Sequence, residues 1–318
     1  MALKHWRRTL FYPAIGLGAH ALRFAVGALP YGALPAVARW SASFVSLFYR
    51  GARQLAVANL TVAFPEWEDA RRTEVFRESR VHAVLTGLEF LWFSRHPDRL
   101  AAAIDIDTPE LASVRAEEAA GRGVLMLTPH LGNWEILGQA TALNGLPVHA
   151  VVARLRNPWI DRLVARSRRY HGLDIIYERG AVREIIRVLK SGEHVALLMD
   201  QNTRPGKGGI FVDFFGLPAA TTRAPAALAR KLGSRVIIGA CVRENGKLCL
   251  RFSELPRPTT GYESDEALTR DLLLANQDLI ARYPEQYAWL YWRWRYIPSE
   301  VAPEVAERYP YYSRRLEE

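Results

Sequence analysis

The first part of the chain lacks acidic residues: neither Asp nor Glu precedes Glu66, although the 318-residue protein carries 33 of them. The basic residues of this stretch are Lys4, Arg7, Arg8, Arg23, Arg39, Arg50 and Arg53. Uninterrupted apolar runs of the roughly 20 residues that span a bilayer are missing too. No small-residue cleavage site follows a compact apolar stretch, which argues against a cleaved signal peptide. An apolar, basic and acid-free region indicates contact with a membrane.

Two arrangements at the membrane stay open. Residues 9–29 could span it, with Arg23 reaching towards the surface, or the helices could lie in the interface. A buried helical hairpin of a soluble protein is the alternative. The basic start of the chain favours the cytoplasmic side. The expected organisation is a membrane-associated helical region over 1–60, followed by one domain over 61–318.

Cysteine is scarce, which excludes a disulfide scaffold. The two cysteines, Cys241 and Cys249, flank Asn245-Gly246, a dipeptide typical of a two-residue hairpin turn. In that register Cys241 lies opposite Leu250, and the two thiols point to opposite faces of the ribbon. A bridge between them is not expected, which favours a reducing compartment. The sequence also has no His/Cys cluster at metal-ligand spacing.

The net charge of +9 predicts an anionic partner: nucleic acid, a phospholipid surface or an acidic protein. No helix-turn-helix, zinc or RNA-binding signature is present, and the basic residues coincide with apolar segments. Nucleic acid is therefore not expected as the partner.

From Gly123 onward, strand-like and helix-like segments alternate. The expected strands are 123–128, 146–152, 174–177 and 195–199, followed by a hairpin over 235–243 and 247–252. The expected helices are 134–143, 158–170, 182–190, 222–232 and 265–283, after an earlier helix over 70–94. This order predicts an α/β domain with a mixed, largely parallel sheet flanked by helices.

One histidine lies where such folds place their sites. His130 follows the apolar strand ending at Thr128 and precedes the helix that begins near Asn133. Glu135, in the first turn of that helix, could fold back and orient the imidazole as in acid–base catalysis. The chain has no G-x-S-x-G elbow, so the substrate's own hydroxyl is the expected nucleophile. A structural histidine at a strand end is the alternative.

The stretch His130-Leu-Gly-Asn-Trp-Glu135 resembles the H-x4-D/E signature of glycerolipid-type acyltransferases. The residues within this motif, including Gly-Asn-Trp, are similar to those of the late acyltransferases of lipid A biosynthesis, which transfer lauroyl and myristoyl groups. Phosphatidylinositol mannoside acyltransferases share much of the pattern. Further stretches that resemble the family lie at 59–66, 154–168, 200–222 and 284–290. Where many members have a histidine after Trp289-Leu290, this chain has Tyr291, which puts a role of that position in substrate choice in doubt.

The resemblance implies a glycerol-3-phosphate acyltransferase-like fold preceded by apolar helices. It also implies that His130 deprotonates the acceptor hydroxyl and that Glu135 orients His130. The remaining expected substrate-binding residues are Gly132, Asn133, Arg154, Arg168 and Asp200. Arg168 would contact acceptor phosphate or the developing oxyanion, and Asp200 would shape the acceptor pocket. The oxyanion donor is expected to be a backbone N–H at the start of the helix, near Gly132 or Asn133.

The implied acceptor is an anionic glycolipid such as a lipid A precursor. The implied donor is an acyl thioester on acyl carrier protein, with acyl-CoA as the alternative, and this activated donor requires neither metal nor cofactor. The expected location is the inner membrane, with the site on the cytoplasmic side. Alternatives are a phosphatidylinositol mannoside or lysophospholipid acyltransferase, or an inactive membrane scaffold. The tryptophans at 289, 292 and 294 could be core residues or an interfacial belt. The interleaved Arg293 and Arg295 favour a surface for the membrane or the carrier protein.

Overall fold

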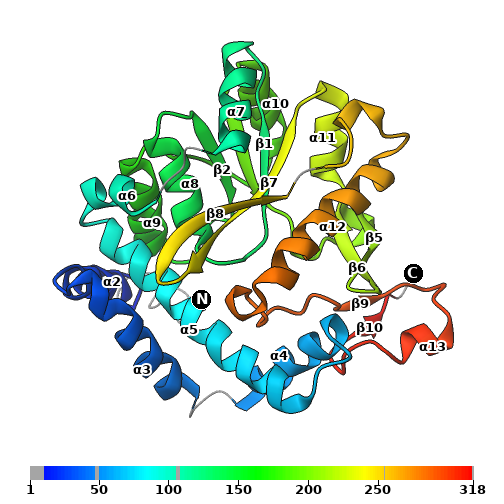
Figure 1. The fold of residues 1–318 in the computed structure, drawn as a ribbon, viewed down its shortest axis with the longest axis horizontal. Helices are drawn as coiled ribbons and strands as arrows, with labels where there is room; N and C mark the ends of the chain where they lie inside the picture. Colours follow the sequence, from blue (N-terminus) through cyan, green and yellow to red (C-terminus); the bar gives the residue numbers. More distant parts are fainter. Residues whose placement is uncertain (1–10, 47–49, 105–107, 254, 317–318) are drawn as a thin grey trace.

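A twisted six-stranded sheet forms the centre of the molecule (Figure 1). The computed structural model describes residues 11–46, 50–104, 108–253 and 255–316. The strands of the sheet are β1 (Leu125–Thr128), β2 (Val148–Val152), β3 (Asp174–Tyr177), β4 (His194–Leu198), β7 (Val236–Glu244) and β8 (Lys247–Ser253). Their order is β3-β2-β4-β1-β7-β8, and only β8 runs antiparallel to its neighbour. The expected mixed, largely parallel α/β sheet is confirmed.

Helices cover both faces of the sheet and create two apolar cores. These helices are α5 (Asp69–Phe93), α7 (Pro109–Ala119), α8 (Trp134–Leu143), α9 (Pro158–Tyr170), α10 (Ala181–Lys190), α11 (Ala224–Leu232) and α12 (Asp265–Arg282). Successive residues of β7 alternate between the cores: Ile238 packs with α10 to α12, whereas Ile237 packs with α5, α7 and α8. Because strand side chains alternate, a strand buried on both faces must be apolar throughout.

The hairpin of β7 and β8 has the predicted register, with Cys241 opposite Leu250. Asn245 and Gly246 form its turn with positive φ angles of 49° and 79°, the backbone that an Asn-Gly turn provides. Cys241 is buried, Cys249 is partly exposed, and both thiols are free.

A second hairpin joins β5 (Gly209–Phe214) to β6 (Leu217–Thr222), in a stretch for which the sequence predicts no strand. Two physical reasons explain why these strands were missed. The turn residues Phe215 and Gly216 have positive φ angles, but Phe-Gly is not a typical hairpin dipeptide. In addition, Pro218 and the alanines of β6 lack the β-branched character of most strands.

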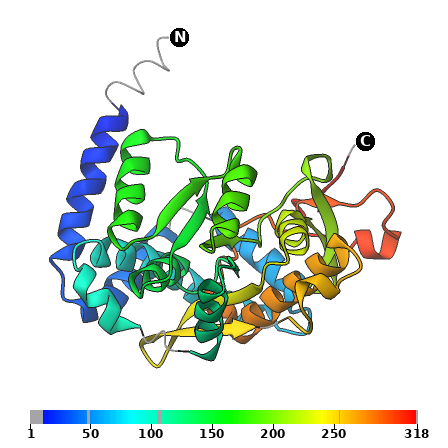
Figure 2. The ribbon, with the colours of Figure 1, turned by 90° about the horizontal axis from the view of Figure 1, so that it is seen from above.

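The first two described helices, α2 (Tyr12–Gly27) and α3 (Leu34–Ser46), pack along α5. The next helix, α4 (Arg50–Ala63), also packs on α5 (Figures 1 and 2). Of the helices in the described ranges, none is long and apolar enough on its own to cross a bilayer. α2 and α3 reach that length and composition only together, and they are bent by 108° at their junction. The Arg23 side chain donates to the Ser94 carbonyl at the end of α5 rather than reaching outward.

Short elements complete the fold: α6 (Pro97–Ala103), α13 (Pro303–Ala306), β9 (Tyr296–Ile297) and β10 (Arg314–Arg315).

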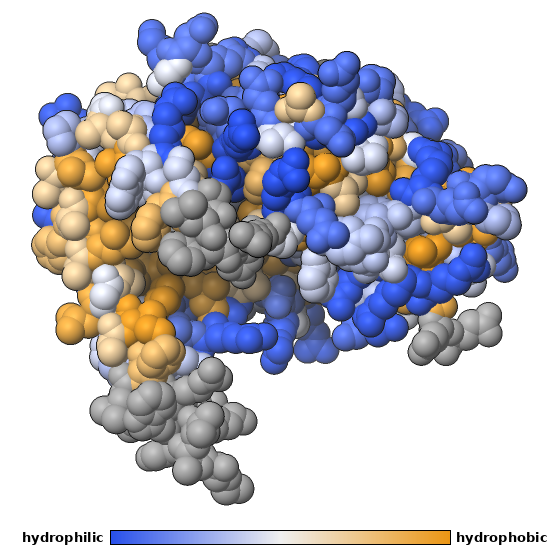
Figure 3. All heavy atoms as spheres, turned by 90° about the horizontal axis from the view of Figure 1, so that it is seen from below, coloured by the Kyte–Doolittle hydropathy of each residue, from blue (hydrophilic) through white to orange (hydrophobic). Residues whose placement is uncertain are grey.

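On α2 and α3, one side is buried and the other exposes large apolar side chains. The exposed ones are Ile15, Leu17, Leu22, Phe24, Trp40 and Phe44. Figure 3 shows apolar surface gathered on the left, the side on which Figures 1 and 2 place these helices.

Candidate active site

Two loops at the carboxyl edge of the sheet bring His130 and Asp200 together. β1 and β4 are adjacent parallel strands, with Thr128 opposite Leu198, so the residues that follow them meet. The Nδ1 atom of His130 lies 2.7 Å from Asp200 Oδ1, and the backbone N–H of His130 donates to Asp200 Oδ2 at 2.8 Å. This double contact fixes the ring and leaves Nε2 directed away from the carboxylate.

The charges of the pair reinforce each other. Burial alone would lower the pKa of His130, but the Asp200 carboxylate outweighs burial through its charge and its hydrogen bond, and the Glu135 charge adds to it. The pKa of His130 is therefore raised. Burial would raise the pKa of Asp200, but the contacts with His130 and the Tyr287 hydroxyl lower it. Asp200 is thus held as a carboxylate that favours the imidazolium.

Glu135 binds Arg168 instead of the imidazole. Its two oxygens accept from Nη2 and Nε of Arg168 at 2.6 and 2.9 Å, a bidentate pair whose side chains are 18% and 17% exposed. The expectation that Glu135 orients His130 through a hydrogen bond is corrected here. The reason is topological, since β4 lies beside β1 and delivers Asp200 to Nδ1, a relation that the local sequence does not reveal.

A polar cavity opens beside these residues. Its lining includes His130, Trp134, Glu135, Asp161, Arg168, Tyr177 and Gln201. The amide nitrogen of Gln201 is 3.4 Å from His130 Nε2, and the Trp134 ring stands edge-on to the imidazole with 5.0 Å between ring centres. The Nε2 atom of His130 therefore has Gln201 beside it and faces a space that a substrate can enter.

An apolar cavity adjoins the polar one. Trp134, Glu135 and Arg168 line both, and the apolar cavity continues between α8 and the sheet. Its other lining residues include Leu111, Met126, Leu137, Val148, Leu173, Ile237 and Phe252. The Glu135–Arg168 pair thus stands between a polar and a hydrocarbon-like environment.

Gly132 and Asn133 have a structural part in the site. The N–H of Gly132 donates to the Gln286 carbonyl at 3.0 Å, and that of Asn133 donates to the Cys241 carbonyl at 2.7 Å. Both N–H groups are occupied, so neither of them points at a substrate oxygen, and an oxyanion donor near the start of the helix stays a prediction. Asn133 instead begins α8, where its side-chain oxygen accepts from the Ile136 N–H.

Arg154 lies on the rim rather than in the cavity. Its guanidinium is exposed and stands 4.0 Å from the centre of the Tyr177 ring. The Tyr177 hydroxyl donates to Asp161, which also accepts from the N–H of Leu155. Arg154 is thus held beside the cavity by residues that line it.

The closing segment is mainly internal, which agrees with the alternative of core residues and corrects the favoured interpretation as a surface for the membrane or the carrier. Trp289, Arg293 and Trp294 are at most 2% exposed, and only Trp292 of the three tryptophans there is open to solvent. Arg293 donates to Ala220 and Thr221 on β6.

Three residues near His130 had not been assigned a role from sequence. Gln201 faces Nε2 of His130, Tyr287 contacts Asp200, and the Tyr291 hydroxyl accepts from the N–H of Asn202. The sequence offered a signal for two of them: Gln201 directly follows Asp200, and Tyr287 lies within the closing motif over 284–290. The contact of Tyr291 with Asn202, two residues after Asp200, could not be read from spacing.

The matching regions of known proteins extend over nearly the whole chain. The family model described as bacterial lipid A biosynthesis acyltransferase matches residues 3–296. The chain belongs to the bacterial lipid A biosynthesis acyltransferase family. It is therefore an acyltransferase, and the recognition of this family from its motifs is confirmed.

Curated relatives of this acyltransferase agree. The chain is 27% identical to the lipid A biosynthesis palmitoleoyltransferase of Escherichia coli, covering 85% of this chain and 87% of the relative. It is 25% identical to the lipid A biosynthesis lauroyltransferase of the same organism, covering 94% and 96%. It is also 27% identical to the phosphatidylinositol mannoside acyltransferase of Mycolicibacterium smegmatis, covering 55% and 58%.

Proposed function

We propose that this acyltransferase moves a fatty acyl chain from acyl carrier protein to a hydroxyl of an anionic glycolipid such as a lipid A precursor. The observation that carries the proposal is the His130–Asp200 pair: Asp200 holds Nδ1 of the imidazole, and the cavity that Arg168 lines also reaches His130. A guanidinium binds phosphate well. The proposed setting is the cytoplasmic side of the inner membrane.

The proposed chemistry is direct transfer. His130 Nε2 takes the proton of the acceptor hydroxyl as its oxygen attacks the thioester carbonyl. The resulting tetrahedral intermediate collapses with cleavage of the C–S bond, and the thiolate leaves with the proton that His130 held. Ester and thiol are the products, and no acyl-enzyme forms. Asp200 stabilises the imidazolium during transfer, and Arg168 contacts acceptor phosphate or the oxyanion.

Glu135 is proposed as the second carboxylate of the site. Its charge raises the pKa of His130, and its oxygens hold Arg168 at the boundary of the two cavities. The apolar cavity suits the acyl chain, because burial of each methylene group is worth about 0.8 kcal/mol. The thioester would then lie beside Glu135 and Arg168, where the two cavities meet. There it would be within reach of the acceptor hydroxyl that His130 binds.

Membrane association is proposed through α2 and α3, which belong to the amino-terminal region of residues 1–60. Their outward sides expose Leu17 and Trp40, which are 72% and 69% open. Exposed apolar patches of this kind mark membrane or protein contacts. The net charge of +9 suits an anionic surface and an acidic carrier protein alike.

A phosphatidylinositol mannoside is the second candidate acceptor, because the mycobacterial relative is named for that substrate. One experiment separates the two. Mass spectrometry of membrane lipids from cells with and without the gene should show a mass difference of one acyl chain on a single lipid class. His130→Ala should reproduce the deletion while the protein still sediments with membranes. Wild-type lipid in the His130→Ala strain would overturn the proposal.

A further inference from the structure

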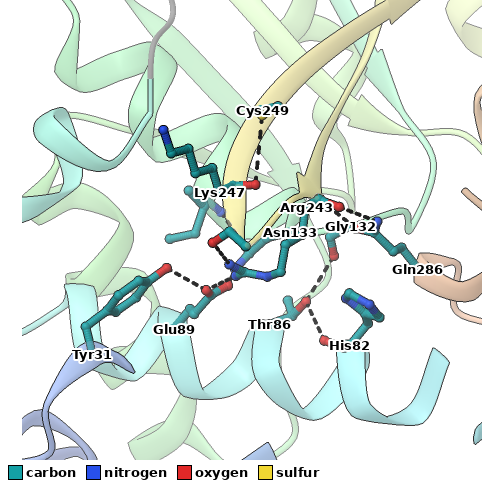
Figure 4. Close-up of polar contacts among 12 residues, drawn as sticks. Tyr31, His82, Thr86, Glu89, Gly132, Asn133, Arg243, Lys247, Cys249 and Gln286 are labelled. Atoms are coloured by element: carbon teal, nitrogen blue, oxygen red, sulfur yellow. Dashed lines mark hydrogen bonds and ion pairs between the residues drawn. The ribbon is translucent and has the colours of Figure 1, made fainter. Parts of the chain in front are cut away.

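A buried carboxylate outside the two cavities contacts the loop that carries the active-site motif. Glu89 on α5 is 2% exposed. Burial of a charge is costly unless it is paired and hydrogen bonded. Glu89 satisfies that condition with three donors: Tyr31 Oη at 2.7 Å, Asn133 Nδ2 at 2.8 Å, and Arg243 Nη2 (Figure 4).

The three donors come from distant parts of the chain. Asn133 begins α8, the helix whose first turn holds Glu135. Arg243 lies near the end of β7, and Tyr31 lies at the bend between α2 and α3. A single carboxylate therefore joins the start of α8, the central sheet and the junction of the two exposed helices.

Neighbouring contacts fix the rest of the loop. Thr86, one turn before Glu89 on α5, donates to the Gly132 carbonyl at 2.9 Å. Gln286 accepts from the N–H of Gly132 through its backbone carbonyl, and its side chain bonds both the N–H and the carbonyl of Arg243 (Figure 4). The carbonyl of His130 in turn accepts from the N–H of Ala288. The loop from 130 to 133 is thus held on both sides by groups that centre on Glu89 and Gln286.

We propose that Glu89 is a positioning residue for acyl transfer: it holds Asn133 and thereby sets where His130 and Glu135 lie. The inference rests on the proposed function, because it concerns the same reacting groups. Glu89 itself reaches neither cavity lining. Its partners are all donors, so a glutamine of equal size must direct its NH2 group at one of them, and the loop must shift.

The test is an exchange of acid and amide between two contacting residues. In Glu89→Gln, kcat should fall at least roughly tenfold, because displacements of about 1 Å at reacting groups have costs of that order or larger. KM for donor and acceptor should stay within about twofold. Asn133→Asp alone should be worse, since it sets two carboxylates against each other.

The double variant Glu89→Gln/Asn133→Asp should recover most of the lost kcat. In it, the glutamine NH2 donates to Asp at 133, while its oxygen accepts from Tyr31 and Arg243. The Asp side chain also accepts from the Ile136 N–H, so every donor has an acceptor again. No recovery in the double variant, or a Glu89→Gln enzyme with wild-type kcat, would overturn the inference.

Asp265→Asn is the matched control. Asp265 accepts from Arg230 at 2.5 Å in another carboxylate–arginine pair, which joins α12 to α11. Its loss should lower the thermal midpoint without changing kcat. A kcat fall in Asp265→Asn as large as that in Glu89→Gln would reduce the effect to general stability and overturn the inference.

A readout that does not need turnover separates this inference from the proposed function. A proton between His130 Nδ1 and Asp200 should give a downfield NMR signal, which is assigned by its loss in His130→Asn. Glu89→Gln should move this signal, and Asp265→Asn should not. If wild-type protein transfers no acyl group, the proposed function is wrong. If the signal does not move in Glu89→Gln, the positioning role of Glu89 is wrong. Should Glu89→Gln not fold, Tyr31→Phe removes one donor only and should move the signal less, and no movement there would count against the inference.

Discussion

At the scale of single residues, the partner of His130 decides how its imidazole can act. Asp200 holds Nδ1 and also accepts from the backbone N–H of His130. The ring therefore presents Nε2 to the cavity in one orientation, with the tautomer that a general base requires. Glu135 and Arg168 form a second, separate pair in the same lining.

The pH dependence of the enzyme should report this pairing. His130 accepts a proton only when neutral, and its raised pKa means that kcat/KM falls as the pH drops through that pKa, above the ordinary value of 6.5. Asp200→Asn removes the charge that raises the pKa, so the acidic limb should move to lower pH. In addition, kcat should fall on the order of 100-fold. If the acidic limb of the pH profile stays in place in Asp200→Asn, the limb reports the titration of a group other than His130.

The Glu135–Arg168 pair should act as a unit. Glu135→Gln leaves the partly buried guanidinium of Arg168 without its carboxylate, and Arg168→Gln leaves the carboxylate of Glu135 without its guanidinium. Each should lower kcat/KM strongly, and the double variant should lose less than the sum of the two free-energy changes. Kinetics of the four enzymes with one donor and one acceptor measure this coupling. Strict additivity would show that the two residues act independently.

His130, Asp200 and Arg168 could be found from sequence, because each lies in a distinctive motif at the end of a strand or on the following helix. Which carboxylate touches His130 could not. That choice depends on the order of strands in the sheet, and the positions of Asp200 and Glu135 along the chain favoured the nearer residue. Glu89 carried no local signal, since its three partners lie 44 or more residues away.

At the scale of elements, the turn from β1 into α8 determines the geometry of the site. Gly132 has a φ of +62°, and a Cβ there would collide with the Cys241 carbonyl. The backbone of the motif therefore passes directly against β7. This close approach explains why the loop needs glycine at that position and tolerates no side chain.

Gly132→Ala should be among the most damaging changes of one methyl group. Collision with fixed backbone adds to the cost of a positive φ, so the free energy of unfolding should fall by about 3 kcal/mol or more. Gly121 is the matched control, because it has a φ of +71° and open space around its Cβ position. Gly121→Ala should cost about 1 kcal/mol. Denaturant unfolding of both variants makes the comparison, and equal costs would contradict it.

The periodic elements were predicted closely, since α8, α9 and β3 begin and end where the sequence placed them. Strong caps explain this accuracy: Asn133 and Asn157 each accept a backbone N–H at the start of their helix. The β5–β6 hairpin escaped prediction because neither its turn nor its second strand has typical composition.

At the scale of the whole molecule, apolar surface is concentrated over α2 and α3 on one side (Figure 3). α2 also packs on α9, the helix that carries Arg168, where a Cβ on Gly16 would meet the Trp159 side chain. The proposed membrane contact and the active site are therefore joined through one helix pair.

Binding to vesicles of anionic phospholipid should depend on this surface. Leu17→Glu and Trp40→Glu together should weaken the partition into vesicles by at least roughly tenfold, because each exchanges an apolar contact of about 1.5 kcal/mol or more for a charge. Leu274→Glu is the control, since Leu274 on α12 is 49% exposed but lies away from α2 and α3. Sedimentation with vesicles measures the effect. Equal loss in the control would assign binding to net charge alone.

The long-range bonds of the catalytic loop also bear on the order in which the protein is made. Gly132 and His130 bond Gln286 and Ala288, and Asn59 near the start bonds the carbonyls of Trp289 and Tyr291. A nascent chain that has emerged only to residue 280 already contains His130, Glu135, Arg168 and Asp200. It still lacks the segment that closes the loop around them. Since non-local contacts form late, the enzyme should become competent only when the segment from Gln286 to Tyr291 has left the ribosome.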